Sequence, residues 1–229
     1  MLDLDTQALA KLFLGMVADA RPEVIMELGA YNADFSLACR SILPDAAIHA
    51  FEANPVIHRG NAGQLRQAGV QMHRLAVGDH SGPAVFSIQR RIDGVEVSPK
   101  KGSNSLRRKP GCIEYEDIPV QMMTVDRFAK KWGLLGRSCA LWIDLEGCAH
   151  EALTGAGKML QTACAVMVEV EDEPFWEGQK LAPEVAALLM AADLAPVARD
   201  HEYGQQYNVI YTPGGVLPPS RRLRTREGA

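Results

Sequence analysis

Apolar residues in the first third of the chain recur with two alternating periods. Helical spacing begins at Leu4 and continues through Phe13 and Met16, so an amphipathic helix is expected over 4–19. The short apolar runs that follow do not alternate, which is typical of strands buried on both faces of a parallel sheet. The expected strands are 24–28, 46–51 and 70–76, and the helices between them are 33–42 and 56–68. This order predicts one half of a doubly wound α/β sheet.

The second half of the chain returns to the same alternation after a different middle segment. Residues 84–89 and 119–123 are strand-like, and residues 91–118 between them are polar and rich in turn formers. Further helices are expected over 125–132, 149–160 and 183–192, and strands over 139–145, 163–170, 194–199 and 207–211. The last two strands predict a closing antiparallel pair. We expect a single domain over 1–215, with 91–118 as an insertion, and a basic tail over 216–229.

Composition narrows the class of protein. Hydrophobic residues make up 47% and charged residues 23%, values that argue against a disordered chain. The net charge of −4 disfavours a nucleic-acid partner, because such proteins neutralise phosphates with an excess of Lys and Arg. No apolar run approaches the ~20 residues that cross a bilayer, so no membrane association is expected. Cysteines without a CxxC pair predict reduced core residues and a cytoplasmic protein.

The ends of the expected strands carry the candidate chemistry, because ligands of open α/β sheets bind at the carboxyl edge. The first strand ends close to Glu27, and Gly29 permits a tight turn and a close approach of a ligand. Glu52 ends the second strand, where a carboxylate can accept hydrogen bonds from ribose hydroxyls. Ala76 and Val77 end the third strand and are small and apolar enough to hold a flat base. These positions predict a nucleoside site.

The loop after the first strand distinguishes between nucleoside cofactors. A dinucleotide site needs G-x-G-x-x-G, because pyrophosphate lies against bare backbone at a helix N-terminus. Gly29 is instead followed by Ala30, and the later glycines are absent. Glu27 and Asp34 bracket the loop and suit a cationic ligand better than pyrophosphate. S-adenosylmethionine, which carries an ammonium, a sulfonium and a ribose, fits this combination, and a nicotinamide-dependent oxidoreductase is the less favoured alternative.

Several segments in a fixed order resemble a known family. They are 26–36, 50–55, 75–79 with Gly82, 103–106, 124–128, 142–147 and 168–170. The most specific are Phe-Glu-Ala-Asn-Pro over 51–55 and Asp-Leu-Glu-Gly over 144–147. In these segments the chain resembles the FkbM-type methyltransferases, a branch of the class I S-adenosylmethionine-dependent methyltransferases.

The resemblance implies a Rossmann-like class I methyltransferase fold with a mostly parallel, seven-stranded sheet, and methyl transfer to a hydroxyl oxygen. It implies that S-adenosylmethionine is held by Glu27, Gly29, Asn32 and Glu52, with Ala76 and Val77 beside the adenine. Further contacts to the cofactor are predicted for Ala30, Phe35, Ser36, Ala53, Asn54, Ser105 and Asp144. The family carries a second glutamate at the position of Ala149, and this departure leaves open a cofactor-binding protein without turnover.

Carboxylates near the ends of the fourth and fifth core strands are the candidate catalytic groups. Asp144 and Glu146 lie two residues apart and point to the same side of an extended backbone, and Glu169 lies on the next strand. One of them, or His150, could remove the proton of an acceptor hydroxyl. The alternatives are helix-capping carboxylates, a local ion pair at Glu169 and a surface histidine. A divalent ion held by these carboxylates is a less favoured possibility, and no residue is assigned as a metal ligand.

The insertion 91–118 is expected to form a lid over the cofactor, with a solvated loop as the alternative. It contains the cations Lys100, Lys101, Arg107, Arg108 and Lys109, which suit a phosphate or carboxylate on the acceptor. We therefore predict an S-adenosylmethionine-dependent O-methyltransferase that acts on a hydroxyl of a small molecule or sugar. Its acceptor is expected to be anionic or glycosylated. Methyl transfer to nucleic acid or protein is the alternative acceptor class. The sequence predicts no oligomeric state.

Overall fold

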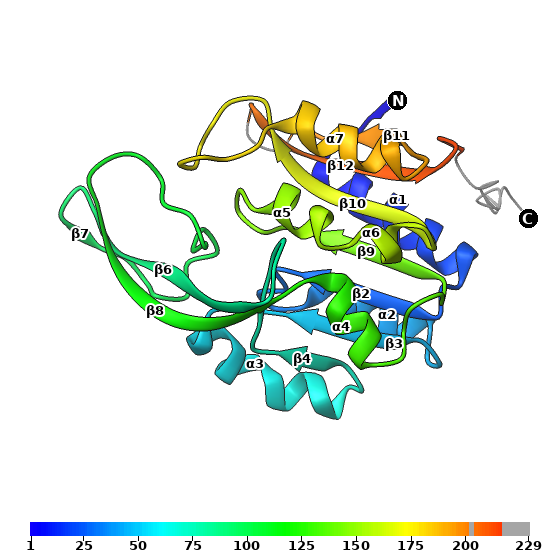
Figure 1. The fold of residues 1–229 in the computed structure, drawn as a ribbon, viewed down its shortest axis with the longest axis horizontal. Helices are drawn as coiled ribbons and strands as arrows, with labels where there is room; N and C mark the ends of the chain where they lie inside the picture. The colour runs from blue at the N-terminus through cyan, green and yellow to red at the C-terminus, as the bar shows by residue number, and fades with distance from the viewer. Residues whose placement is uncertain (202–203, 217–229) are drawn as a thin grey trace, which may run out of the picture.

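The computed structural model describes residues 1–201 and 204–216, so the predicted tail lies, apart from Val216, outside the described residues. The described chain forms an α/β sheet in the order β1-β11-β12-β10-β9-β2-β3-β4 (Figure 1). Its strands are β1 (Leu2–Asp3), β2 (Val24–Leu28), β3 (Ala47–Phe51), β4 (Gln71–His73), β9 (Cys139–Ile143), β10 (Ala163–Glu171), β11 (Leu194–Arg199) and β12 (Gln206–Pro213). All of the expected core strands are present, and β1 is an added edge strand that was not predicted.

The direction of the strands confirms the predicted doubly wound sheet. β2 pairs in parallel with β3 and β9, and β9 pairs in parallel with β10. β12 runs antiparallel to both β10 and β11, so it is the closing antiparallel strand. The central strand β2 is buried along its whole length, which explains its continuous apolar run.

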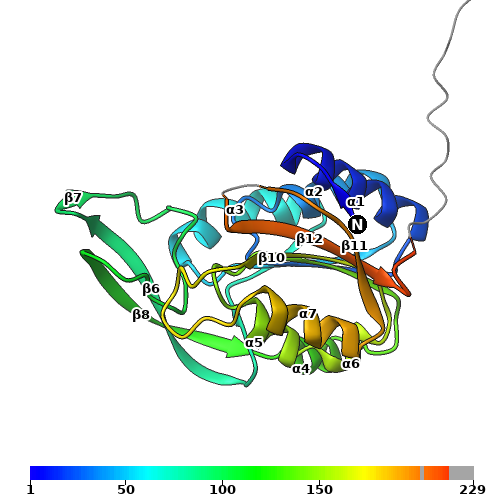
Figure 2. The same cartoon turned by 90° about the horizontal axis from the view of Figure 1, so that it is seen from above.

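Helices cover both faces of this sheet (Figure 2). One face packs on α1 (Thr6–Ala20), α2 (Asp34–Ile42) and α3 (Pro55–Gln67), and the other on α4 (Val125–Lys131), α5 (Ala149–Thr154), α6 (Gly157–Leu160) and α7 (Ala182–Ala191). Two clusters of buried side chains fill the two interfaces. The helix predicted over 149–160 is divided into α5 and α6 around Gly155. A Cβ there would lie 2.3 Å from the Gly78 carbonyl oxygen, so the close approach requires glycine.

A second sheet projects from the body of the molecule as a long hairpin (Figures 1 and 2). It has the order β5-β8-β6-β7, with β5 (Ala76–Val77), β6 (Gly82–Ile92), β7 (Val95–Glu96) and β8 (Ile113–Met123). The strand predicted over 70–76 was wrong in its extent, because the chain leaves the main sheet after His73 and pairs with Met122 and Met123.

The insertion was also predicted wrongly at its two ends. Residues 91–92 and 113–118 belong to the hairpin strands rather than to a loop, and Ile92 pairs with Ile113. The polar residues at these positions face solvent on the projecting sheet, so their pattern resembles that of a loop. No helix among the described residues is long and apolar enough to cross a membrane. The single domain over 1–215 stays a prediction.

Candidate functional site

The loop that follows β2 lies against the end of β9. The Asp144 amide donates to the Leu28 carbonyl at 2.9 Å, and Gly29 has a φ of 82°. A Cβ on Gly29 would lie 1.6 Å from the Asp144 carbonyl oxygen. Because this neighbour is backbone and the φ is left-handed, position 29 accepts only glycine. The turn therefore brings the two strand ends into direct contact.

Glu27 is buried beneath this loop and acts as a helix cap. Its Oε2 accepts the Ser36 amide at 2.8 Å near the start of α2, where Ala33 offers no side-chain cap. Burial raises the pKa of Glu27 to about 7, although hydrogen bonds from Ser36 oppose the rise. Ser36 thus holds Glu27 and lines neither of the two cavities described below, so its direct contact with a cofactor stays a prediction.

Glu52 is a buried carboxylate held by backbone on both sides. Its Oε2 accepts the Tyr31 amide at 3.1 Å, and its Oε1 accepts the Asn54 amide at 2.7 Å. Burial raises the pKa of Glu52 to about 7, and the nearby Asp144 adds to the rise. Each carboxylate oxygen can still accept another hydrogen bond, because it has two lone pairs. The carboxylate is thus positioned rigidly with capacity for a ligand's hydroxyl groups.

A cavity of about 830 Å³, here called the first cavity, opens beside Glu52 at the carboxyl edge of the sheet. On the β4 side it is lined by Ala53, Ala76, Val77 and Phe86. On the β9 side it is lined by Gly29, Asp144 and Glu146. The insertion contributes Lys101, Gly102, Asn104 and Leu106 to its wall. The lining changes from apolar to acidic across the sheet.

A neighbouring cavity of about 920 Å³, here called the second cavity, lies under α1 and contains the remaining predicted loop residues. It is lined by Glu27, Ala30, Asn32 and Phe35, and it shares Gly29, Tyr31 and Asp144 with the first cavity. The Phe35 ring lies 5.0 Å from the Trp142 ring and 5.2 Å from the Phe13 ring, between centroids. Apart from Ser36 and Ser105, the predicted cofactor residues therefore fall into two adjacent cavities that meet at Asp144.

Asn54 and Ser105 connect the insertion to the sheet. Asn54 Nδ2 donates to the Pro99 carbonyl at 2.7 Å, and Asn54 also lines the first cavity. Ser105 Oγ donates to the Glu146 carbonyl at 2.7 Å and lines neither cavity. The structure therefore makes Ser105 a support for Glu146, and its direct contact with a cofactor stays a prediction.

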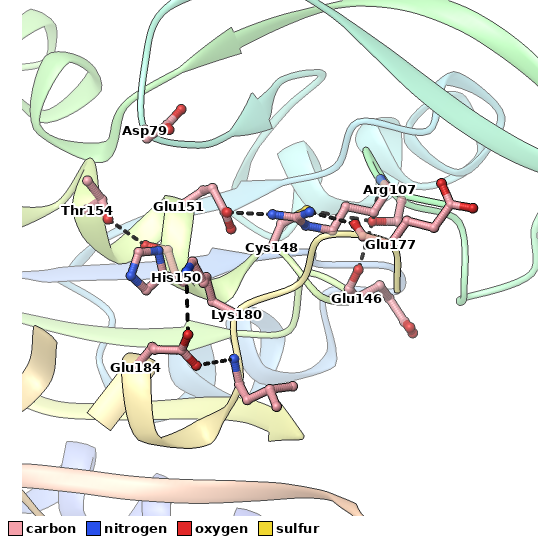
Figure 3. Close-up of polar contacts among 12 residues, drawn as sticks. Asp79, Arg107, Glu146, Cys148, His150, Glu151, Thr154, Glu177, Lys180 and Glu184 are labelled. Atoms are coloured by element: carbon pink, nitrogen blue, oxygen red, sulfur yellow. Dashed lines mark hydrogen bonds and ion pairs between the residues drawn. The ribbon is translucent and has the colours of Figure 1, made fainter. Parts of the chain in front are cut away.

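Most cations of the insertion contact protein groups. Arg107 pairs with Glu151 of α5 and also donates to the Glu177 carbonyl at 2.7 Å (Figure 3). Arg108 pairs with Asp117 at 2.6 Å. The Lys109 ammonium lies 4.3 Å from the centroid of the Trp176 ring. Of the five cations, Lys101 lines the first cavity, so the cationic surface available to an acceptor is smaller than the sequence indicates.

Asp144, Glu146 and Glu169 come together at the ends of β9 and β10. One carboxylate oxygen from each lies within 4.8 Å of the others. The pKa of Glu169 is raised well above its ordinary value by burial, and then by the charges of Asp144 and Glu146. His150 is not part of this group. It lies on α5 near Glu184 and lines neither cavity, so its role as a base stays a prediction (Figure 3).

Several residues that line the cavities were not assigned from the sequence. In the first cavity they include Tyr31, Leu75, Phe86, Gly102, Asn104 and Leu106, and in the second they include Gln7, Lys11 and Trp142. Phe86 could have been found, because Phe86 and Ile88 alternate with polar residues and mark one face of a strand. Gln7 and Lys11 carry no such signal, since they belong to the polar face of a predicted helix.

The fold and the cavities define an α/β protein with two adjacent cavities at the carboxyl edge of its sheet. A family model described as the methyltransferase FkbM domain matches residues 27–207. The chain belongs to this family and is an S-adenosylmethionine-dependent methyltransferase. No curated protein matches it.

Solved structures with a similar arrangement were also found. A precorrin-6y C5,15-methyltransferase from Geobacter metallireducens is 12% identical at a TM-score of 0.47, over 91% of this chain and 89% of that one. The N-terminal domain of EvdMO1, determined in the presence of S-adenosylhomocysteine and D-fucose, is 11% identical at a TM-score of 0.46. This match covers 90% of this chain and 79% of the EvdMO1 domain. An O-methyltransferase family protein from Burkholderia thailandensis is 10% identical at 0.46. That match covers 90% of this chain, which spans 55% of the Burkholderia protein.

Proposed function

We propose that this chain is an O-methyltransferase that moves the methyl group of S-adenosylmethionine to a hydroxyl of a small molecule or sugar-containing metabolite. One observation carries the proposal: the first cavity is lined by Glu52 and, across β2, by Asp144 and Glu146. Glu52 suits a ribose, whereas the pair of carboxylates suits a group that loses a proton. A cofactor between them would direct its reactive end at the carboxylates.

The binding of the cofactor follows from the lining of the first cavity. The ribose hydroxyls donate to Glu52, whose oxygens are already oriented by backbone amides. The adenine lies among the small and apolar residues Ala76, Val77 and Phe86. The cationic methionine portion extends past Gly29 towards Asp144, where the backbone approaches closely enough to leave no room for a side chain.

The reaction is an in-line displacement. The bond between the sulfonium sulfur and its methyl carbon breaks, and the electron pair stays on sulfur as S-adenosylhomocysteine forms. A bond between the acceptor oxygen and the methyl carbon forms, and the hydroxyl proton passes to a carboxylate and then to solvent. Alignment of oxygen, carbon and sulfur can contribute up to ~7–11 kcal/mol, and a positioned base typically contributes about 10²–10⁴-fold.

A small acceptor fits the described surface better than a nucleic acid. Arg107 and Arg108 are neutralised by Glu151 and Asp117, so the insertion offers little free positive charge for a phosphate backbone. Lys101 remains at the cavity and could meet an acidic group on the acceptor. The role of 91–118 as a lid, the basic tail and the cytoplasmic location stay predictions.

The proposal is tested by transfer of a labelled methyl group. The protein is incubated with S-adenosylmethionine labelled on the methyl, together with pools of sugars, glycosides and hydroxy acids, and the label is traced to an ether by mass spectrometry. We expect label on oxygen in at least one pool. Label recovered only on nitrogen, on nucleic acid or on protein would contradict the acceptor class.

A further inference from the structure

The three carboxylates Asp144, Glu146 and Glu169 are closer together than their charges favour. Their oxygens lie within 4.8 Å of one another. Two like charges about 4 Å apart repel by about 4 kcal/mol at an effective dielectric constant of 20. A fold that brings three of them together needs a compensating positive charge or bound protons.

Glu169 supplies a second, independent observation. Its Oε1 is closed off from solvent and has no hydrogen-bond partner among the described residues. A buried carboxylate oxygen without a partner destabilises the fold, because it has lost its hydrogen bonds to water and no protein donor replaces them. The charges that raise the pKa of Glu169 most are those of Asp144 and Glu146, and one of its two oxygens is among the three that lie within 4.8 Å of one another.

Glu171 on the same strand shows that the fold can satisfy a carboxylate in this region. Its Oε2 accepts the Gln179 amide and its Oε1 accepts the Gln206 amide. Burial raises the pKa of Glu171 to about 7. Two residues earlier, Glu169 keeps an oxygen without such a donor. Gln206 also hydrogen-bonds to Glu169, so the atom of this side chain that stays without a partner is Oε1 alone.

The turn that carries Glu146 is held in an unusual conformation. Glu146 has a φ of 50° and Gly147 a φ of 86°. Ser105 fixes the Glu146 carbonyl, and a Cβ on Gly147 would lie 2.5 Å from the Trp176 ring, so the turn is fixed on both sides. A non-glycine residue in the left-handed region costs on the order of 1 kcal/mol, and such strain is concentrated at functional sites.

We propose that Asp144, Glu146 and Glu169 bind one hard divalent cation, Mg²⁺ or Mn²⁺. The donor set consists of carboxylate oxygens without imidazole or thiolate, which favours these ions over zinc. The cation neutralises the crowded charges and gives Glu169 Oε1 the partner that it lacks. Three protein ligands leave coordination positions open for water or for an acceptor oxygen.

The proposal also deepens the proposed function, on which this step rests. A cation held here would lower the pKa of an acceptor hydroxyl bound to it, so with the cation present the proton passes to solvent without a carboxylate as the base, before the oxygen takes the methyl group from sulfur. The favoured acceptors would carry a second oxygen next to the reacting hydroxyl, because two adjacent oxygens can fill two open positions. Vicinal diols of sugars and 2-hydroxy acids have this arrangement.

The test is a titration of the full chain with Mn²⁺, followed through the electron paramagnetic resonance signal of the free ion. We expect one bound Mn²⁺ per chain in the wild type and at least tenfold weaker binding in Glu169→Gln. The exposed Glu173, a few residues along the chain, provides the control Glu173→Gln, which should bind like the wild type. Glu169→Gln removes one of the crowded charges and keeps the shape, so the variant should fold.

The outcomes separate this proposal from the proposed function. Binding in the wild type that Glu169→Gln leaves unchanged, or no binding at millimolar Mn²⁺, would overturn the cation site. Titration with S-adenosylhomocysteine is performed in parallel. Cofactor binding and methyl transfer that persist after chelation would contradict the cation site alone. Mn²⁺ binding without any cofactor binding would support the cation site and contradict the proposed function.

Discussion

The carboxylates on the two sides of the first cavity differ in how their negative charge is stabilised. On one side Glu52 is a single carboxylate whose two oxygens each accept a backbone amide. On the other side Asp144 and Glu146 line the cavity and crowd together with Glu169, which lines neither cavity and whose Oε1 has no partner among the described residues. A satisfied carboxylate suits neutral donors such as ribose hydroxyls, whereas a crowded group suits a proton or a cation. The difference indicates which side binds and which side reacts.

The largest effect is expected at Gly29, which joins the two sides. Gly29→Ala would force a Cβ against the Asp144 carbonyl oxygen, at 1.6 Å in the present backbone. We expect a loss of about 3 kcal/mol or more in the free energy of unfolding, together with loss of cofactor binding. Urea denaturation measures it. Gly15→Ala is the control, since Gly15 lies in α1 with open space around it, and should be neutral or stabilising. Equal stability of Gly29→Ala and the wild type would refute the close contact.

Asp144→Asn tests the reactive side alone. The substitution keeps the size of the side chain and removes its charge, so we expect S-adenosylhomocysteine affinity within a few-fold of the wild type. Turnover should fall by roughly 10²–10³-fold, as for the loss of a positioned base or metal ligand. Calorimetry and label transfer measure the two quantities. A loss of affinity as large as the loss of turnover would show that Asp144 binds the cofactor instead, as the sequence also predicts.

Glu52→Ala tests the binding side. Removal of two hydrogen bonds to a charged acceptor, at roughly 1.5 kcal/mol each, predicts about a hundredfold weaker binding of S-adenosylhomocysteine. Glu52→Gln keeps one acceptor oxygen, so its affinity for S-adenosylhomocysteine should lie between those of the wild type and Glu52→Ala. Unchanged affinity in Glu52→Ala would place the ribose elsewhere.

The pKa of Glu52, about 7 without ligand, predicts a pH dependence of binding. Ribose hydroxyls donate to the carboxylate, so the bound state has a lower pKa than the free state. Affinity is therefore complete above pH 7 and declines as the pH falls through that value. We expect roughly tenfold weaker S-adenosylhomocysteine binding at pH 6 than at pH 8. Glu52→Gln should lose most of this dependence, whereas affinity that rises on acidification would reverse the assignment.

The smallest effect is expected at Ser105. Its hydroxyl holds the Glu146 carbonyl, and one such hydrogen bond contributes about 1 kcal/mol. Ser105→Ala should lower turnover a few-fold and leave S-adenosylhomocysteine affinity unchanged. Ser103→Ala, on the same segment, is the matched control. A fall in affinity would support the direct cofactor contact that the sequence predicts.

The sheet could be read from the sequence because its core strands are continuous apolar runs that end at a glycine or a carboxylate. The hairpin could be read only in part: 84–89 and 119–123 are predicted as strands, whereas residues 113–118 are largely exposed and lack the signal of a buried strand. The strand end at 70–76 was misplaced for a related reason. Leu75 and Ala76 follow the polar His73 and Arg74 with no turn residue to mark a strand end, and pairing with β8 decides which sheet Ala76 joins.

The site shows the same limit. Glu27, Gly29, Glu52 and Asp144 could be placed because strand ends of a parallel sheet meet at one edge. The missing partner of Glu169 Oε1 depends on where donors such as Gln179 fall in three dimensions. The neutralisation of Arg107 depends on Glu151, which is distant in the sequence. Spacing along the chain carries no information on either contact.

The central claim is that the first cavity binds S-adenosylmethionine. The most direct test is a calorimetric titration of the wild-type chain with S-adenosylhomocysteine at pH 8. The account predicts saturable binding with one site per chain. Absence of binding at a protein concentration far above the expected dissociation constant would contradict it.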